Sequence, residues 1–130
     1  MPALNFCARF AEAVEYGEKL QTVRAVRKDG RPHCKKGDRI RLYTGMRTKQ
    51  CRLLGEATVT HTARIRIEAT EMFINDRRLP SAIYARNCEE TDNEFAEADG
   101  FESFMDMSRW FEEAHRLPFV GTVIYWDAPR

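Results

Sequence analysis

Short runs that alternate between apolar and polar residues dominate this chain and predict a β-rich fold. Residues 39–43 read Arg-Ile-Arg-Leu-Tyr, and residues 64–67 read Arg-Ile-Arg-Ile. A period of two places successive side chains on opposite faces, which is typical of a half-buried strand. Residues 71–74 are expected to pair with residues 79–84 across an Asn75-Asp76 turn. Further strands are expected at residues 4–6, 22–26, 50–52, 55–62 and 119–126.

Other segments have the period and the end signals of helices. Residues 10–16 predict a short helix that Gly17 ends, because glycine adopts the left-handed conformation that follows many helices. Residues 91–94 read Thr-Asp-Asn-Glu, a capping box that starts a helix. This helix is expected to run to about residue 99, where Gly100 ends it.

The last predicted helix carries an apolar stripe. Ser103 is expected to cap it and Pro118 to end the segment. The stripe recurs at helical spacing and is interpreted as core; it comprises Phe104, Met107, Phe111 and Ala114. Many short strands with two or three helices predict an α+β fold, a partly open β-barrel of short mixed strands with helical decoration.

Length and composition predict a single domain over residues 1–130. Hydrophobic residues make up 43% and charged residues 32%, which is ordinary for a globular domain that buries a core. The start of the chain lacks the basic and apolar regions of a signal peptide, so a cytoplasmic location is expected. A monomer is the favoured oligomeric state. The four cysteines are scattered without a C-x-x-C pair, so we expect reduced thiols, no metal and no cofactor.

The net charge of +1 conceals a strong polarity along the chain. Residues 1–66 carry 15 Lys/Arg against 6 Asp/Glu, whereas residues 67–130 carry 6 against 14. Such asymmetry predicts an anionic partner for the basic half, or a fold in which the two halves neutralise each other. If a basic patch survives folding, phosphate contacts would give salt-dependent affinity for nucleic acid.

The most informative motif lies at residues 17–24 and reads G-x-K-x-x-T-x-R. Thr22 and Arg24 are two residues apart, so in a strand they face the same way. Lys19 lies between Gly17 and this strand and can swing back over that face. An amine, a hydroxyl and a guanidinium together suit an anionic or carbonyl-bearing ligand. The alternative is an exposed turn followed by a polar strand face.

Three later segments extend the motif in a fixed order. They are Lys36-Gly37-Asp38 before a strand, Ala96-Glu97-Ala98-Asp99-Gly100-Phe101 at a helix end, and the aromatic closing segment 119–126. In this order the set resembles the ASCH domain family of the PUA-like superfamily, and the resemblance covers nearly the whole chain. It implies a small PUA-like β-barrel.

The resemblance also implies a chemistry. Family members that are amidohydrolases on N4-acetylated cytidine place a Lys, a Thr and a Glu together, and the matching positions are Lys19, Thr22 and Asp99. A desolvated lysine can act as base or nucleophile, the threonine can stabilise an oxyanion, and the acid can orient water. Asp99 is one methylene shorter than the family's Glu, which puts catalysis in doubt; Glu97 is a fallback acid. Lys19 is expected to lie in an open cleft, so that its truncation would leave the fold intact.

The resemblance equally fits a binding module for RNA or a nucleoside, since PUA-like barrels commonly bind RNA or modified bases. Base stacking is open to Tyr43, Tyr84 and Trp126, and the favoured alternative for each is a place in the core or at its rim. The polar loop at residues 44–49 is expected to form a mobile lip or a plain solvated hairpin. A metal-independent ribonuclease is a third alternative. The expected ligand-binding residues are Gly17, Arg24, Arg27, Lys36, Arg39, Tyr43 and Arg47, and the catalytic candidates are expected to converge with Arg24 on one pocket.

Overall fold

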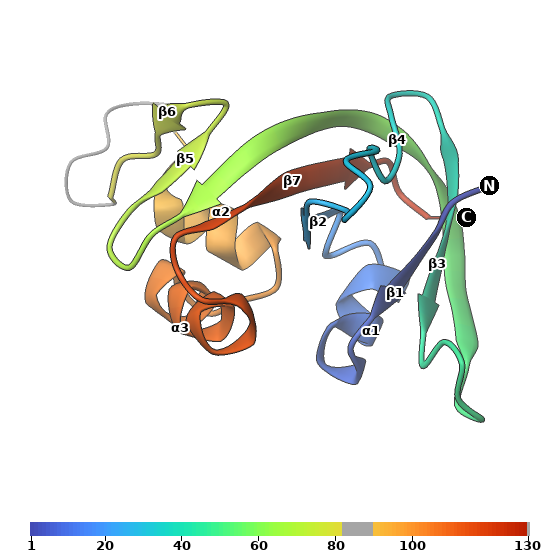
Figure 1. The fold of residues 1–130 in the computed structure, drawn as a ribbon. Coiled ribbons are helices and arrows are strands. Elements are labelled where there is room, and N and C mark those ends of the chain that lie inside the picture. The colour runs from blue at the N-terminus through green and yellow to red at the C-terminus, as the bar shows by residue number, and fades with distance from the viewer. Residues whose placement is uncertain (82–89, 130) are drawn as a thin grey trace. The chain divides into compact units, whose positions relative to one another are not determined.

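The computed structural model describes residues 1–81 and 90–129 of the chain (Figure 1). This described part is α+β, with seven strands in one mixed sheet and three helices. The elements in chain order are β1 (Ala3–Phe6), α1 (Ala8–Glu15), β2 (Gln21–Ala25), β3 (Arg39–Thr44), β4 (Arg52–Ile67), β5 (Met72–Ile74), β6 (Arg77–Arg78), α2 (Asp92–Ala98), α3 (Phe104–His115) and β7 (Phe119–Trp126). The α+β class predicted from the sequence is confirmed.

The strands are joined in the order β1-β3-β4-β5-β6, and β7 pairs with both β4 and β2. β1 and β3 run parallel, whereas β3–β4, β4–β5 and β5–β6 are antiparallel hairpin pairs. The register pairs Arg39 with Thr58 and Arg41 with Glu56. It then shifts between Leu42 and Tyr43, so that Tyr43 lies opposite Leu53. This shift is a β-bulge, which leaves one residue of β4 without a partner on β3.

The chain divides into two compact units, each described by itself. Unit 1 comprises Met1–Thr22, Arg27–Thr62 and Ile124–Arg130, and unit 2 comprises Val23–Val26 and Ala63–Val123. In unit 1, α1 packs on β1 and β3. Phe10 and Val14 are four residues apart and therefore lie on the same face of α1, where both are buried. They meet a strand core in which Ile40 and Leu42 are fully buried.

Unit 2 holds α2, α3 and the β5–β6 hairpin. Thr91 caps α2 by a reciprocal capping box with Glu94, as the sequence predicts, and Ser103 accepts a hydrogen bond from the Asp106 N–H at the start of α3. The two helices pack on each other, and Phe95 and Met107 are fully buried. Ala114 is exposed, so its assignment to the core stripe is wrong; the three larger residues of that stripe are buried.

Strand boundaries differ from the predictions in two places. The runs expected separately at residues 55–62 and 64–67 form one strand, β4, which also includes Arg52, because the bulge near Gly55 interrupts the pairing without ending the strand. The rest of the strand expected at residues 50–52 is wrong, since residues 50 and 51 precede β4. The turn at Asn75 and Asp76 is confirmed, with both residues at positive φ, as a two-residue hairpin turn requires. Its second strand begins at Arg77 rather than residue 79, and residues 82–84 lie outside the described part.

Candidate nucleic-acid interface

The glycine that opens the sequence motif ends α1 as predicted. Gly17 has a φ of +77°, a left-handed conformation that favours glycine. The N–H groups of Glu18 and Lys19 then both donate to the Ala13 carbonyl, at 2.8 and 2.9 Å. These bonds satisfy a carbonyl of the last helical turn. They also fold the chain back on the helix, so that Lys19 returns toward α1.

Lys19 lies in the interior of the protein rather than at the edge of an open cleft. Its side chain is only 2% exposed. The Nζ atom lies 5.0 Å from the centroid of the Phe10 ring and 6.0 Å from that of Phe6, within range of a cation–π attraction. The expectation of an open-cleft lysine is therefore wrong, and with it the reason for expecting an intact fold after truncation.

The residues expected to converge with Lys19, the catalytic candidates Thr22 and Asp99 and the ligand residue Arg24, fall in both units. Thr22 follows Lys19 in unit 1 at the start of β2 and is buried, with 5% exposure. Arg24 and Asp99 belong to unit 2. Arg24 lies on β2 and is partly exposed, whereas Asp99 is the C-cap residue of α2 and is 3% exposed. The convergence of these four residues on one pocket stays a prediction. Glu97, the fallback acid, is exposed on α2.

The clearest surface of unit 1 is the outward side of β3. Ile40 and Leu42 point into the core, so Arg39, Arg41 and Tyr43 share the opposite face and are at least partly exposed. We call these three residues the β3 face. Their spacing of two residues places successive side chains roughly 7 Å apart along the strand. Arg39 and Tyr43 were expected ligand residues; Arg41 was missed, although the same alternation marks it.

Partners on β4 hold this face in place. The Arg39 guanidinium donates to Thr58 Oγ1 at 3.0 Å, and Arg41 lies 3.8 Å from a Glu56 carboxylate oxygen. Both are exposed contacts, which typically stabilise by less than about 1 kcal/mol and leave the guanidinium accessible to another anion. Tyr43 lies opposite Leu53, which is 47% exposed. The face therefore ends in an accessible apolar pair.

Basic loops flank both ends of the β3 face. At its start Lys35 and Lys36 are exposed on a tight turn, where the Gly37 N–H donates to the Val59 carbonyl at 2.8 Å. At its end Arg47 and Lys49 are exposed in the hairpin between β3 and β4. The same basic character thus continues beyond each end of the strand.

The hairpin loop at residues 44–49 is tied together by its own hydrogen bonds. Thr48 Oγ1 donates to the Gly45 carbonyl at 2.6 Å and accepts from the Gln50 N–H at 3.1 Å. The Met46 N–H donates to Asn5 Oδ1 on β1 at 3.0 Å. These bonds fit the hairpin alternative among the two expectations for this loop.

The loop before β3 carries more positive charge. Arg27, another expected ligand residue, is exposed and lies 3.2 Å from Asp29. Asp29 also accepts from the Arg31 N–H, and Asp38 accepts from the Lys35 N–H. Both carboxylates therefore hold turns of the loop in place while its lysines and arginines face solvent.

Charge is segregated between the two units. Unit 1 contains 13 Lys/Arg and 7 Asp/Glu, a formal charge of +6, whereas unit 2 contains 8 and 13, a charge of −5. Folding therefore keeps most of the asymmetry seen along the sequence. A positively charged unit raises the local concentration of anionic partners.

Of the aromatic residues expected to stack on bases, one is accessible in the described part. Trp126 is 3% exposed and packs edge-on against Phe6, with ring centroids 5.8 Å apart, so it belongs to the core. Tyr84 lies outside the described residues. Tyr43 is partly exposed beside Leu53, which makes it the candidate for stacking.

No protein-family model, curated protein or solved structure matches this chain. Within residues 1–81 and 90–129, no cluster of three His, Cys, Asp or Glu side chains has the arrangement of a metal site. None of the helices in that part of the chain is long and apolar enough to cross a membrane.

Proposed function

We propose that this protein binds RNA, or a nucleoside derived from it, through the β3 face of unit 1. The observation that carries the proposal is the exposed row of Arg39, Arg41 and Tyr43 on a strand whose alternate residues are fully buried. A buried core on one side fixes which side chains face solvent. The row is therefore a fixed feature of the strand rather than a chance grouping of mobile loops.

The chemistry of the row suits a single strand of nucleic acid. Guanidinium groups bind phosphate by paired hydrogen bonds, and basic loops at both ends extend the positive track. Tyr43 with Leu53 gives a flat apolar surface on which an unpaired base can stack. Duplex RNA hides its base faces, so this surface favours single strands. We also propose that the chain folds as a PUA-like barrel of the ASCH type and acts as a monomer in the cytoplasm.

Fluorescence anisotropy with a labelled single-stranded RNA tests this function. The double variant Arg39→Ala/Arg41→Ala should lose about 10-fold or more in affinity, since each charge-assisted contact contributes about 1 kcal/mol or more. The control Arg109→Ala/Arg116→Asn removes the same charge from exposed positions in unit 2. Position 116 has a φ of +77° and a ψ of 155°, a conformation that is no less favourable for asparagine than for the native arginine. Equal losses in the two variants would refute the β3 face as the binding surface.

A second candidate function is the removal of an acyl group from N4-acylated cytidine. The observation that favours it is the buried Lys19 amine beside two aromatic rings, since a lysine held out of bulk solvent is available as a base or nucleophile. In this proposal Thr22 would stabilise the oxyanion and Asp99 would orient water.

A product assay with a panel of N4-acylated cytidines decides between hydrolysis and binding. If the chain is an enzyme, Asp99→Glu restores the acid of the amidohydrolases and should raise turnover, while Lys19→Met should abolish it. If wild type and Asp99→Glu both bind RNA and neither releases product, hydrolysis is refuted and the binding function stands.

A further inference from the structure

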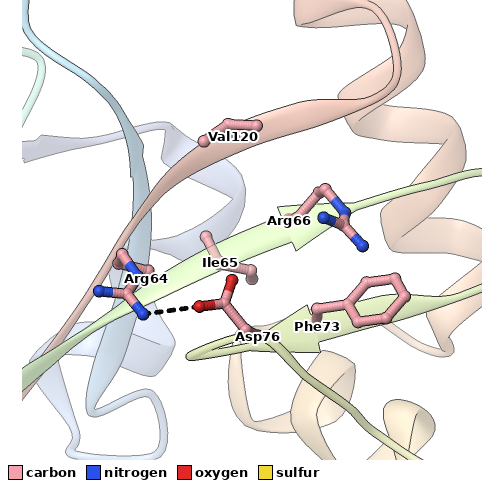
Figure 2. Close-up of a pocket in the computed structure, with 6 residues that line it drawn as sticks. All are labelled: Arg64, Ile65, Arg66, Phe73, Asp76 and Val120. Carbon is pink, nitrogen blue, oxygen red and sulfur yellow. Dashed lines mark hydrogen bonds and ion pairs between the residues drawn. The ribbon is translucent and has the colours of Figure 1, made fainter.

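Unit 2 carries a small hollow on the outward side of its strands. It has a volume of about 120 Å³. β4 contributes Arg64 and Arg66, which alternate with the buried Ile65. Figure 2 shows both guanidiniums above the β5–β6 hairpin, with Val120 of β7 on the other side of β4. We call this the Val120 hollow; it is lined by Arg64, Ile65, Arg66, Phe73, Asp76 and Val120.

Arg66 is held as a flat platform. Its guanidinium carbon lies 4.0 Å from the centroid of the Phe73 ring, its direct cross-strand partner. Its Nε donates to Glu68 at 3.0 Å. Among the described residues, its two terminal nitrogens have no partner. A guanidinium stacked on one aromatic ring can stack on a second planar group with its other face and donate to an anion with its edge.

Arg64 supplies a second cation whose present partner is easily displaced. It pairs with Asp76 at 2.8 Å, but the two side chains are 73% and 78% exposed. Exposed ion pairs of this kind contribute about 0–1 kcal/mol. A ligand anion can therefore compete with Asp76 for Arg64. Val120 is 58% exposed, although the residues on either side of it in β7 are buried. Its side chain therefore offers an apolar wall to the hollow.

We propose that the Val120 hollow binds a planar ring that carries a negative charge. The ring lies against Val120 and the platform formed by Arg66 and Phe73, and the anion meets the terminal nitrogens of Arg66 and Arg64. A nucleoside monophosphate and an aromatic carboxylate share this chemistry. The site lies in unit 2 and does not depend on RNA binding by unit 1.

NMR titration of the ¹⁵N-labelled full chain tests this site, with uridine 5′-monophosphate, benzoate, uridine and inorganic phosphate as probes. Saturable shifts of the Arg66, Phe73 and Val120 amides with the monophosphate or with benzoate support the site. The probe that binds with the higher affinity shows whether the ligand is a nucleoside monophosphate or an aromatic carboxylate. Uridine and phosphate should bind about 10-fold more weakly, because each lacks one of the two recognised groups. Equal binding of phosphate and the monophosphate, or no shift with any probe, overturns the proposal.

Three variants separate recognition from a structural role. Arg66→Lys keeps the charge but loses the flat stacking surface, so affinity should fall about 5-fold. Arg109→Ala, an exposed arginine of the same unit, should leave it unchanged. Asp76→Asn should raise affinity about 3-fold, because it frees Arg64; Asn tolerates the φ of +69° at this position. Unchanged affinity in both Arg66→Lys and Asp76→Asn would refute the site. A loss of probe binding in Arg39→Ala/Arg41→Ala would also refute it, because the site does not depend on the β3 face.

Discussion

The two units of this chain are similar in size and opposite in charge. Unit 1 carries +6 and presents its arginines and lysines on a strand face and two loops, whereas unit 2 carries −5 and contains α2 and α3. Each unit also buries a group of its own sign: Lys19 in unit 1 and Asp99 in unit 2. The net charge of each unit and the sign of the charged group that it buries therefore agree.

Under the proposed function, this difference gives the two units separate tasks. The exposed cations of unit 1 can attract a polyanion at long range, and the row on β3 can hold it. The acidic unit would repel the same ligand, except where two arginines line one site, as they do at the Val120 hollow. Variants that move RNA affinity should therefore lie in unit 1, and variants in the helices of unit 2 should change stability alone.

The largest expected effect is on the stability of unit 1. Lys19→Ala removes a side chain that is 2% exposed and packs beside Phe10, so it should lower the free energy of unfolding by about 2 kcal/mol or more. Lys19→Met keeps most of the volume and should cost less. Urea denaturation measures both. An alanine variant as stable as wild type would show that Lys19 does not belong to the interior.

The next effect sharpens the role of stacking. Tyr43→Ala should weaken binding of single-stranded RNA by about 10-fold, the loss typical of one stacked base. Its salt dependence should stay the same, because no phosphate contact is removed. Anisotropy titrations at two salt concentrations test this, with Tyr43→Phe as the control that keeps the ring. A Tyr43→Ala variant that changes only the salt dependence would contradict a stacking role.

A cap variant tests whether unit 2 affects stability without affecting RNA binding. Thr91 Oγ1 accepts from the Glu94 N–H at 3.0 Å, and the Glu94 side chain accepts from the Thr91 N–H at 3.3 Å. Thr91→Ala should therefore lower the free energy of unfolding by about 1 kcal/mol, while Thr91→Ser should retain most of it. RNA affinity should not change in either variant; a loss of affinity would tie α2 to the binding surface.

The smallest expected effect concerns pH. Burial raises the pKa of Asp92 above its ordinary value of 3.8, and the hydrogen bond from the Asn93 backbone only partly opposes this. The unfolded chain then releases its proton at lower pH than the folded chain, so stability falls as pH rises from 3.8 to the folded pKa and is level above it. Asp92→Asn should raise the melting temperature slightly at pH 7 and leave it unchanged near pH 3. A lower melting temperature at pH 7 would contradict a net cost of burying this carboxylate.

Sequence periodicity gave most of the fold because it reports on local structure. Alternation identified β3, and the capping residues Thr91 and Ser103 marked the starts of α2 and α3 correctly. Strand ends were less predictable, since the bulge that lets β4 continue past Gly55 depends on its pairing with β3. The sequence around Gly55 gives no local indication of its pairing with β3.

The candidate site was predictable in residue type but not in environment. Gly17 behaves as expected, and the alternation of β3 marks Arg39 and Tyr43 correctly as solvent-facing. The burial of Lys19 was missed, because it depends on Phe6 and Phe10, which lie elsewhere in the chain. The Val120 hollow was also missed, since it joins residues of β4, β5 and β7.

The salt dependence of RNA binding tests the central claim most directly. For single strands, each phosphate contact contributes about 0.7 to the slope of log affinity against log salt concentration. If Arg39 and Arg41 contact phosphates, the slope for Arg39→Ala/Arg41→Ala should be shallower than that of wild type by about 1.4, and the slope for Arg109→Ala/Arg116→Asn should equal that of wild type. Identical slopes for all three proteins would contradict the claim that the β3 face binds RNA.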